Sequence, residues 1–411
     1  MYTYKIVIHP NNKQRTKILN TMNKCIECQN IIYDILDNLL KTNKSLPTCS
    51  QIRKEFTKIK KDKDLVTKLF QKGLTKKEQR MYHVDVLFYD VSNDALKQTI
   101  KDTYNAFVRC FKKISKYPKR KSYIDSHKSF YIDPIKIKFT ENKVKLEKIS
   151  NSLKRNRAVL NWVKLAEKNR IPINVKYYNP RVSYDGDRFY LTVAVDDINR
   201  PLKKKETKQI DKTVGIDLNI NRIVTSKPNV YNSINRSKKV KRLERKLKRL
   251  QRKQSKRYLL AKERKFKSKK NLIKIIKKIR KVYNKLKNIR DDYQYKIIYN
   301  IIYDNSYNIK INKVVIETLD VKEMSKNKNI SNKIQISSFR KFINKLKYIT
   351  YKDDITLIEA NKYYPSSKKC NRCGEIKKEL TLKDRIYKCN KCGLEIDRDI
   401  NAAINLANYI S

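Results

Sequence analysis

Glycine is scarce in this sequence, and its scarcity argues against several classes of phosphate-binding protein. Only five glycines occur among the 411 residues. They leave no room for a Gly-rich loop, so neither a P-loop NTPase nor a Rossmann enzyme is expected. Long apolar runs are missing too: no segment approaches the roughly 18 apolar residues of a membrane-spanning helix, and "MYTYKIVIHPNNKQR" lacks the core of a signal peptide. We therefore expect a protein that works inside the cell, is not secreted and has no membrane partner.

Acidic residues are few relative to basic ones. Asp and Glu number 40 against 100 Lys and Arg, which gives a formal net charge of +60. This imbalance indicates a polyanionic partner, and nucleic acid is favoured over a membrane surface. The charge is more than one DNA duplex seems to need, which favours a large bound RNA. At 411 residues the chain can hold roughly two or three domains, and therefore an enzyme.

The eight cysteines are more consistent with metal binding than with disulfides, because the sequence gives no sign of an oxidising compartment. Four of them form C-x2-C-x15-C-x2-C, with Gly374 and Gly393 directly after the two pairs. Such knuckles supply four thiolates in a tetrahedron, so the pattern predicts a structural zinc ribbon. Because every position is filled by a thiolate, no site is open for water, and the zinc organises rather than catalyses. The predicted zinc ligands are Cys370, Cys373, Cys389 and Cys392.

A second Cys-x-x-Cys, formed by Cys25 and Cys28, stands inside a helical pattern with no matching pair nearby. We interpret these two as core cysteines, since a metal site would need ligands from elsewhere. The histidines His9, His83 and His127 stand in no ligand-like spacing and receive no role.

The first half of the chain predicts a β domain with a helical excursion. Residues 2–9 alternate like a strand, and residues 11–115 carry apolar side chains at helical intervals. From residue 129 the alternation returns, around an Asp185-Gly186 turn. A charged linker at 199–211 marks the main boundary.

The second half predicts strands around a long basic helical hairpin. A strand is expected at 212–220, and residues 237–304 form basic helices with two apolar stripes. The outer Lys and Arg faces of this hairpin fit a phosphate-tracking surface as well as a merely solvated one. A buried strand at 311–321, a helix and a strand at 355–364 follow before the cysteine module.

Three acids stand where strands or a helix end. Asp217 follows Ile216 in "VGIDLNI", Glu317 follows the apolar run "VVI", and Asp399 opens the helix "INAAINLAN". Each has a structural explanation when taken singly, such as the preference of a helix N-terminus for a carboxylate. Three such acids in one α/β unit can also converge on two Mg²⁺ ions about 3.5–4 Å apart, which activate water for phosphodiester hydrolysis. The small residues Asn401 to Ala403 would let the last helix lie close to the sheet.

Four stretches in combination resemble a known family. They are "GIDLNINRIVTS", "VVIETLDV", "YYPSSKKCNRCG" and "YKCNKCGLEIDRDINAAINLAN". They resemble the transposon-encoded TnpB proteins and their eukaryotic and viral relatives, the Fanzor proteins, which are RNA-guided DNA endonucleases similar to compact type V CRISPR effectors. The resemblance covers the C-terminal half closely and the N-terminal half more loosely. The long basic stretch at 237–304 departs from the commonest pattern, which leaves the guide contacts open.

The resemblance implies a multidomain α+β fold. An N-terminal wedge β-barrel-like domain holds an inserted helical recognition domain and is followed by a RuvC-type, RNase H-like α/β nuclease with a zinc-ribbon insertion. The implied boundaries are 1–10 and 120–205 for the wedge, 11–119 for the helical domain, 206–365 and 396–411 for the nuclease with the basic hairpin at 237–304, and 366–395 for the zinc ribbon, a target nucleic-acid-binding domain.

The resemblance also implies the catalytic acids and their cofactor. The family's acids fall on Asp217 in "GIDLN", on Glu317 in "VVIETL" and on Asp399 in "DINAA", and they would hold catalytic magnesium. Asp397 is the rival for the last position in "DRD". Because Cys392 lies only seven residues before Asp399, we expect the zinc ribbon to fix the start of the last helix and to lie over the cleavage groove.

The expected function is Mg-dependent DNA cleavage directed by a guide RNA, next to a short motif in double-stranded target DNA. The expected assembly is one protein chain with one RNA. Such a protein would work in the cytoplasm of a prokaryote, or in the nucleus for a eukaryotic or viral copy. Two alternatives use the same residues differently: an RNase H-like transposase would act on transposon ends without RNA, and a non-enzymatic zinc-ribbon binder would use the acids only structurally.

Overall fold

The structure, a computed structural model, divides the chain into two compact units. One comprises Met1–Arg200 with Lys267–Arg280, and the other comprises Pro201–Phe266 with Lys281–Ser411. No helix among the described residues is long and apolar enough to cross a membrane. The described residues are 2–43, 46–61, 91–123, 127–147, 161–196, 208–227, 229–263, 270–304, 309–324, 326, 331, 334, 337–377, 379–381 and 384–409.

The first unit is built on a seven-stranded antiparallel sheet in the order β2-β6-β7-β1-β5-β4-β3. In β7 every second residue is buried, as expected where one face of a sheet covers a core. The predicted turn between β6 and β7 is confirmed. Gly186 has φ +95°, and Asp185 Oδ1 accepts hydrogen bonds from the backbone N–H groups of Asp187 and Arg188. The strands are β1 (Tyr2–His9), β2 (Lys128–Tyr131), β3 (Lys138–Phe139), β4 (Lys143–Lys145), β5 (Trp162–Leu165), β6 (Tyr177–Tyr184) and β7 (Phe189–Val195).

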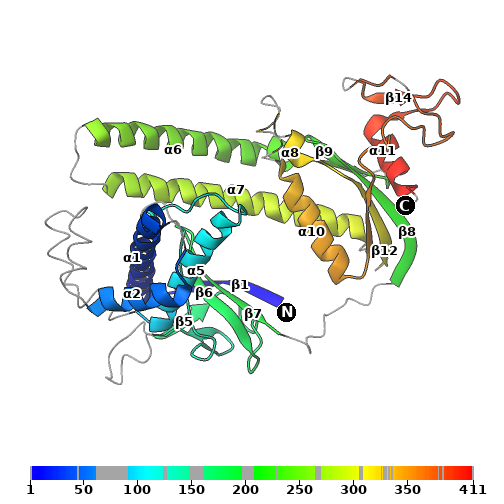
Figure 1. Cartoon of the computed structure of the whole chain (residues 1–411). Helices are drawn as coiled ribbons and strands as arrows, with labels where there is room; N and C mark the ends of the chain where they lie inside the picture. The colour runs from blue at the N-terminus through cyan, green and yellow to red at the C-terminus, as the bar shows by residue number, and fades with distance from the viewer. Residues whose placement is uncertain are drawn as a thin grey trace. The chain divides into compact units, whose positions relative to one another are not determined.

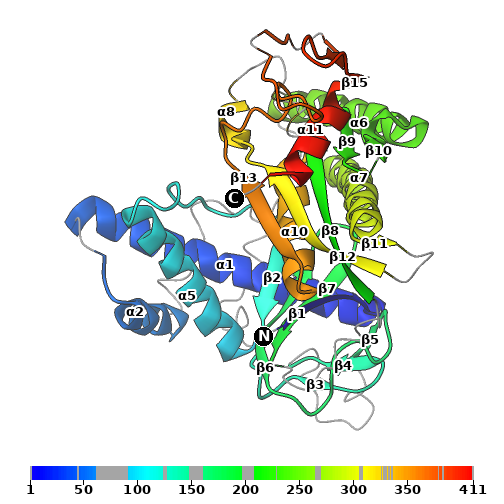
Figure 2. The same ribbon diagram turned by 90° about the vertical axis from the view of Figure 1, so that its right-hand side faces the viewer.

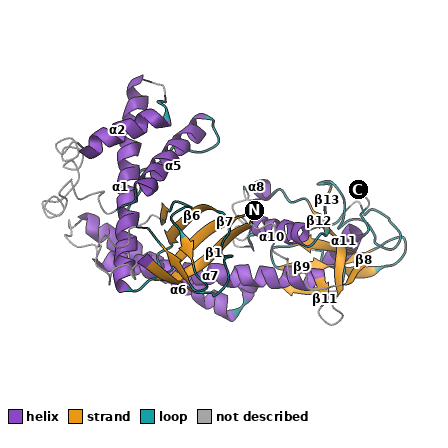
Figure 3. Ribbon diagram, turned by 90° about the horizontal axis from the view of Figure 1, so that it is seen from below, coloured by secondary structure: helices purple, strands orange, loops and turns teal. Residues whose placement is uncertain are grey.

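Three helices of the first unit confirm the helical pattern between its strands. They are α1 (Asn12–Asn43), α2 (Cys49–Lys61) and α5 (Asn93–Phe111), and α1 and α5 lie side by side in Figure 3. Their apolar stripes pack with the sheet into one core, in which Cys25 and Cys28 are buried as predicted. The part of the helical pattern at 62–90 lies outside the described residues.

The second unit is built on a six-stranded mixed sheet. Strands β8, β9 and β10 form an antiparallel meander, after which β12 runs parallel to β8, and β13 runs parallel to β12 (Figure 2). Parallel neighbours of this kind need crossover connections, here supplied by the long helical segments. The strands are β8 (Lys208–Leu218), β9 (Arg222–Thr225), β10 (Val230–Asn232), β11 (Tyr303–Asp304), β12 (Ile309–Glu317) and β13 (Thr356–Ala360).

Two long helices confirm the predicted basic hairpin. Helices α6 (Lys238–Glu263) and α7 (Lys270–Ile302) are drawn in green to yellow in Figure 1. Their apolar stripes meet in a small cluster, so the i, i+3 and i, i+4 spacing of leucines and isoleucines did predict the packing face. The cluster contains Val240, Leu243, Leu247, Leu250, Val282, Leu286 and Ile289, packed with Ile234.

Helices cover the two faces of the mixed sheet. Helix α7 and helix α10 (Phe339–Lys352) pack against the face that carries Ile216 and Ile316. Helix α11 (Arg398–Ala407) packs against the opposite face, where Leu406 meets Val315. Because side chains alternate along a strand, positions 215 and 217 of β8 and positions 315 and 317 of β12, which follow the register shift after Ile311, belong to the face that α11 covers.

Gly215 sets how closely α11 approaches β8. A Cβ atom at this position would lie 2.0 Å from the carbonyl oxygen of Ala403 and 2.5 Å from the nitrogen of Ala407. Only a residue without a side chain allows this approach. The small residue Ala403 therefore meets the sheet as the sequence predicted.

The smaller elements include α8 (Val321–Met324), the 3-10 turn η3 (Ile234–Arg236) and the hairpin of β14 (Ile386–Lys388) with β15 (Glu395–Asp397). The fold is thus a mixed α/β architecture in two units, as the sequence predicted at that level. The wedge and RuvC assignments and the domain boundaries stay predictions.

Candidate active site and metal centre

Asp217 and Glu317 come from neighbouring parallel strands. Ile216 of β8 pairs with Ile316 of β12, so the two acids occupy the next positions of both strands. The backbone N–H of Leu218 donates to Glu317 Oε1 at 3.2 Å, which ties the glutamate to the end of β8. By strand alternation both side chains belong to the face that α11 covers.

Asp399 comes to the same face from α11. It lies in the first turn of this helix, and its side chain is only 8% exposed. The helix contacts β8, β9 and β12. The close approach at Gly215 therefore places Asp399 beside the ends of the two strands that carry the other acids.

The pKa values of Asp217 and Glu317 show that their neighbouring carboxylates lie within electrostatic reach. Burial raises the pKa of Asp217 well above its usual value, and the negative charges of Glu317 and Asp399 raise it further. Arg398 and Arg222 act in the opposite direction.

Burial is also the largest influence on Glu317, whose pKa it raises to about 7. The hydrogen bond from Leu218 lowers this pKa, and the charge of Asp399 raises it. Burial and nearby negative charge thus disfavour the charged forms of Asp217 and Glu317, and a bound cation would favour them.

Two polar side chains that the sequence reasoning missed contact these acids. Asn219 donates from Nδ2 to Asp217 Oδ2 at 2.6 Å. Arg222 donates from Nε to Asp399 Oδ2 at 2.7 Å and forms an ion pair with Asp397 at 2.9 Å. Both residues lie in the segment "GIDLNINR", at the turn from β8 to β9, so their nearness to Asp217 in sequence was the available signal.

Asp397, the rival for the third position, has a different environment. It is the N-cap of α11, and its Oδ1 accepts hydrogen bonds from the backbone N–H groups of Asp399 and Ile400. Its side chain is 30% exposed, against 8% for Asp399. The deeper and less bonded carboxylate, Asp399, is therefore the better candidate ligand.

The four predicted zinc ligands come together. Their sulfur atoms all lie within 4.8 Å of one another, and among the described residues no other three His, Cys, Asp or Glu side chains gather this tightly. Gly374 and Gly393 have φ values of +79° and +69°, and the nitrogen of each donates to the carbonyl of the first cysteine of its pair. The backbone N–H groups of Cys392 and Lys391 lower the pKa of Cys389 to about 6. At Cys373 a backbone hydrogen bond at Glu375 lowers the pKa, but burial and the other three thiols raise it to about 12. The compact set of four thiols fits zinc.

Two buried asparagines fasten the cysteine module to α11. Asn401 Nδ2 donates to the carbonyl of Lys369 at 2.8 Å, and Asn401 Oδ1 accepts from the backbone N–H of Asn371 at 3.1 Å. Asn405 donates to the carbonyls of Ser366 and Lys369. The sequence predicted Asn401 as a small spacer toward the sheet, whereas the structure uses it as a clamp on the segment that leads into the first cysteine pair.

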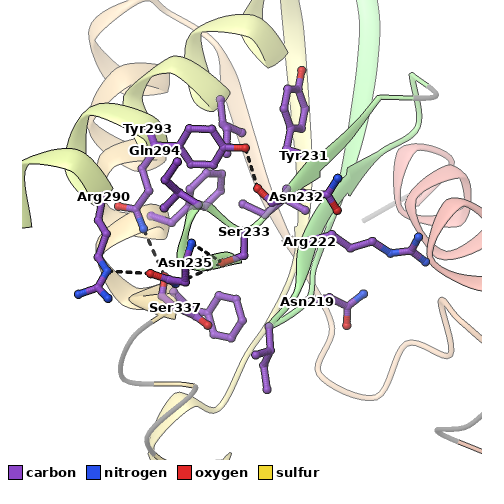
Figure 4. Close-up of a pocket in the computed structure, with 16 residues that line it drawn as sticks. Asn219, Arg222, Tyr231, Asn232, Ser233, Asn235, Arg290, Tyr293, Gln294 and Ser337 are labelled. Carbon is purple, nitrogen blue, oxygen red and sulfur yellow. Dashed lines mark hydrogen bonds between the residues drawn. The ribbon is translucent and has the colours of Figure 1, made fainter. Parts of the chain in front are cut away.

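A pocket of about 50 Å³, lined in part by Asn219 and Arg222, lies at the turn from β8 to β9 (Figure 4). Arg290 donates to Asn235 Oδ1 at 2.8 Å, and the Tyr293 hydroxyl donates to the carbonyl of Asn232 at 2.7 Å. These polar groups bond to one another and join α7 to β10 and η3, so we assign the pocket no ligand. Its apolar lining is Ile220, Ile223, Ile234, Ile297, Phe339 and Phe342.

Two family models match the part of the chain that contains this site. The model described as "Probable transposase" matches residues 190–328, and the model described as "Cas12f1-like, TNB domain" matches residues 339–406. Together they span about half of the chain and include all three candidate carboxylates and all four cysteines.

Two curated relatives show a similar level of identity. A protein of Streptomyces pristinaespiralis named "Putative RNA-guided DNA endonuclease" is 31% identical over 117 residues, which are 28% of this chain and 27% of that protein. TnpB-like protein L79 of Acanthamoeba polyphaga mimivirus is 31% identical over 125 residues, which are 29% of this chain and 22% of the relative. The match therefore spans about a quarter of the length of these relatives.

Two solved structures align with most of the chain. The cryo-EM structure of a Cas12f1-sgRNA-target DNA complex aligns over 99% of this chain and 98% of that one, at 13% identity and a TM-score of 0.31. The cryo-EM structure of a CRISPR-Cas12f ternary complex covers 96% and 81%, at 13% identity and a TM-score of 0.33. Scores this low support no argument about the fold. On the family models and the curated relatives, the chain belongs to the TnpB/Cas12f-type family.

Proposed function

We propose that this chain is an RNA-guided, Mg-dependent DNA endonuclease that cleaves target DNA next to a short motif. The observation that carries the proposal is the gathering of Asp217, Glu317 and Asp399 on one face of the mixed sheet, with the pKa of the first two raised. Buried acids that oppose each other's ionisation are typical of cation sites and of catalytic centres.

The three carboxylates would hold the catalytic cations. Two magnesium ions bound there would activate a water molecule and stabilise the leaving oxygen of a phosphodiester. Asp217 and Glu317 supply oxygens from adjacent strand ends, and Asp399 supplies oxygens from the helix above them. A pair of ions about 3.5–4 Å apart spans a wider set of ligands than one ion does. This agrees with carboxylates that interact electrostatically without converging as tightly as the cysteines.

The strand order supports the RNase H-like part of the proposal. An antiparallel meander of β8 to β10 that continues into the parallel strands β12 and β13 is the order expected of such a nuclease sheet. The acids lie on two strands and one helix of this arrangement.

The remaining surface would deliver the nucleic acid. Half of the residues of α6 are Lys or Arg, and Tyr258 is 64% exposed among them. Cations that track phosphates, with interleaved aromatic rings on which bases stack, suit a nucleic acid that is at least partly single-stranded. Base pairing with the guide would read the target sequence, while the protein would read the adjacent motif and the duplex shape.

The four cysteines would hold a structural zinc ion. Through Asn401, Asn405 and strand β15 the module is joined to α11, so zinc would hold the helix that carries Asp399. The zinc ribbon therefore supports cleavage more than it supports binding.

The deciding experiment is to purify the protein from its native locus, sequence the RNA that accompanies it, and supply that RNA with matched target DNA and Mg²⁺. We expect double-strand cleavage that follows a reprogrammed guide. The Asp217→Asn protein is the control, because it keeps the fold and the RNA but loses one ligand oxygen charge. Cleavage without RNA, or equal cleavage by the control, contradicts the proposal.

The second candidate function is a transposase that acts on transposon ends without RNA. The family model described as "Probable transposase" favours it. The same purification separates the two, because a transposase would bind specific transposon ends after RNase treatment and would join strands. A non-enzymatic binder would give no nicking in Mg²⁺, and Asp217→Asn would then change no reaction.

A further inference from the structure

Arg222 contacts two acids at once, in an arrangement that the three-acid site does not explain. Its Nε and one terminal nitrogen lie 2.7 and 2.5 Å from Asp399 Oδ2. The same terminal nitrogen lies 2.9 Å from each carboxylate oxygen of Asp397. Arg222 is three-quarters buried, with 25% of its side chain exposed. The planar guanidinium of arginine holds its N–H donors in fixed directions, whereas the ammonium group of lysine does not.

The contacts of Arg222 fall on one oxygen of Asp399. Oδ2 receives both of them. Within the described part of the chain, no hydrogen bond reaches Oδ1 of this carboxylate. Rotation of the Asp399 carboxylate about its Cβ–Cγ bond would break both contacts of Oδ2 with Arg222. These contacts therefore also fix the direction of Oδ1.

The position of Arg222 is itself fixed from several directions. The turn from β8 to β9 closes with a bond from the Asn219 nitrogen to the Arg222 carbonyl at 3.0 Å. Arg222 pairs with Asn232 of β10. Its guanidinium extends toward α11 in Figure 4. The turn that follows Asp217 therefore also carries the group that holds Asp399.

Asp397 connects this arrangement to the cysteine module. It is the last residue of β15, where it pairs with Ile386, and it also caps α11. The Asp397 carboxylate thus accepts hydrogen bonds from the N-terminus of α11 and from Arg222. It also offsets the charge of Arg222, so the pair adds no net charge beside Asp399.

We propose that Arg222 and Asp397 form a positioning pair that fixes the Asp399 carboxylate through Oδ2, so that Oδ1 is presented to a divalent cation shared with Asp217 and Glu317. This inference rests on the proposed function. In it Asp397 orients a cation ligand and does not bind the cation itself. Partners in the second layer around a metal orient its ligands, and their loss typically costs about 10- to 100-fold in metal affinity or activity.

A purely electrostatic role makes the opposite prediction for one variant. If only charge mattered, Arg222→Gln would tighten cation binding, Asp397→Asn would weaken it, and the double variant would leave it unchanged because the two charges cancel. If the pair positions Asp399, all three variants weaken binding. Asn is as good a helix N-cap as Asp, so Asp397→Asn keeps the helix start.

The test measures Mn²⁺ binding to the full-length, zinc-loaded protein freed of nucleic acid, by the electron paramagnetic resonance signal of free Mn²⁺. The Asp399→Asn protein defines the background. We expect the Arg222→Gln/Asp397→Asn protein to bind Mn²⁺ about 10- to 100-fold more weakly than the wild type. Arg222→Lys keeps the charge but loses the fixed directions of the donors, and it should weaken binding as well.

Cleavage supplies a second measurement. The Mg²⁺ concentration that gives half-maximal cleavage should rise by a similar factor in the double variant, while the rate at saturating Mg²⁺ recovers most of the wild-type value. A merely structural loss would lower the rate at every Mg²⁺ concentration. Lys347→Gln, which breaks the ion pair of Lys347 with Glu359 elsewhere in the same unit, is the matched control and should change neither quantity.

Each outcome decides a different question. Unchanged Mn²⁺ affinity in the double variant, or tighter binding by Arg222→Gln, overturns the positioning role. Equal binding by the wild type and Asp399→Asn overturns the carboxylate cation site, and with it the proposed nuclease. Zinc content and thermal unfolding check that each variant folds; if the double variant does not, Asp397→Asn and Arg222→Lys decide between charge and position.

Discussion

The two units bury cysteines and acids of the same kinds, but they surround them with different numbers of polar and charged partners. In the first unit, α1 places Cys25, Glu27 and Cys28 in or beside an apolar core. Burial raises the pKa of Cys25 to about 12 and that of Glu27 to about 7, and Oε2 of Glu27 has no hydrogen-bond partner in the described chain. These groups are therefore stored mainly in their neutral forms.

The second unit brings its cysteines and acids together from distant segments. The sulfur atoms of its four clustered cysteines lie within 4.8 Å of one another, and Arg222 forms an ion pair with Asp399. The comparison teaches that Cys-x-x-Cys spacing or a buried acid alone does not make a metal site. What distinguishes the second unit is the number of partners that the fold brings to one place.

Among the changes that test this comparison, loss of a zinc ligand should have the largest effect on the protein. Cys389→Ser removes one of four thiolates, and structural zinc contributes about 10–16 kcal/mol of binding free energy in small zinc modules. We expect the variant to lose its zinc and most DNA cleavage while it keeps most RNA binding. Metal analysis, a cleavage assay and a filter-binding assay measure the three quantities. Cleavage by this variant at the full rate would contradict the coupling between zinc and Asp399.

The next effect belongs to the acid cluster. Asp217→Asn should reduce cleavage by about 10³-fold or more, equivalent to about 4 kcal/mol of transition-state stabilisation. In metal-free buffer the same change should raise the unfolding temperature of the second unit, because it removes one of three repelling buried acids. Single-turnover cleavage and differential scanning calorimetry test both. A variant that is less stable without metal would show that the acids do not repel one another.

The buried Glu27 of the first unit should respond to pH. The pKa of Glu27 is about 7 in the folded chain, above its ordinary value of 4.5, so the folded state holds a proton that the unfolded state has lost. Stability of this unit should therefore fall as pH rises from about 4.5 to about 7. Glu27→Gln should remove this fall and stabilise the unit by about 1–3 kcal/mol at pH 8.

The single tryptophan, Trp162, lies on β5 of the first unit, so its fluorescence during denaturation reports on that unit. An unchanged pH profile in Glu27→Gln would mean that another group titrates.

The smallest effect should come from a first-unit cysteine. Cys28→Ala removes a fully buried sulfur and should cost about 1 kcal/mol, as expected for a small loss of buried apolar surface. Zinc content and cleavage should not change, and tryptophan fluorescence measures the stability. Loss of zinc from this variant would contradict the assignment of Cys25 and Cys28 to the core.

The sequence predicted the positions of Asp217 and Glu317 because strand alternation and an acid after an apolar run are local features. It predicted the cysteine cluster because the ligand spacing and the following glycines are also local. The two stripes of the basic hairpin were predictable for the same reason.

The partners of these residues were not predictable from local patterns. Arg222 and Asp399 are 177 positions apart, and their contact depends on how α11 lies against β8. Asn401 was expected to act through its small size, but its hydrogen bonds depend on where the segment before Cys370 passes. Such long-range contacts cannot be predicted from local sequence patterns, because they depend on how the elements pack.

The absence of a side chain at Gly215 determines the position of α11 on the sheet. Any added carbon there would collide with the backbone of α11 at Ala403. A bulkier residue would act as a wedge and tilt the last helix outward, carrying Asp399 away from the strand ends while every charged group stays chemically intact. On the proposed function, such a change would abolish cleavage without altering any acid, and it would leave the binding of nucleic acid intact.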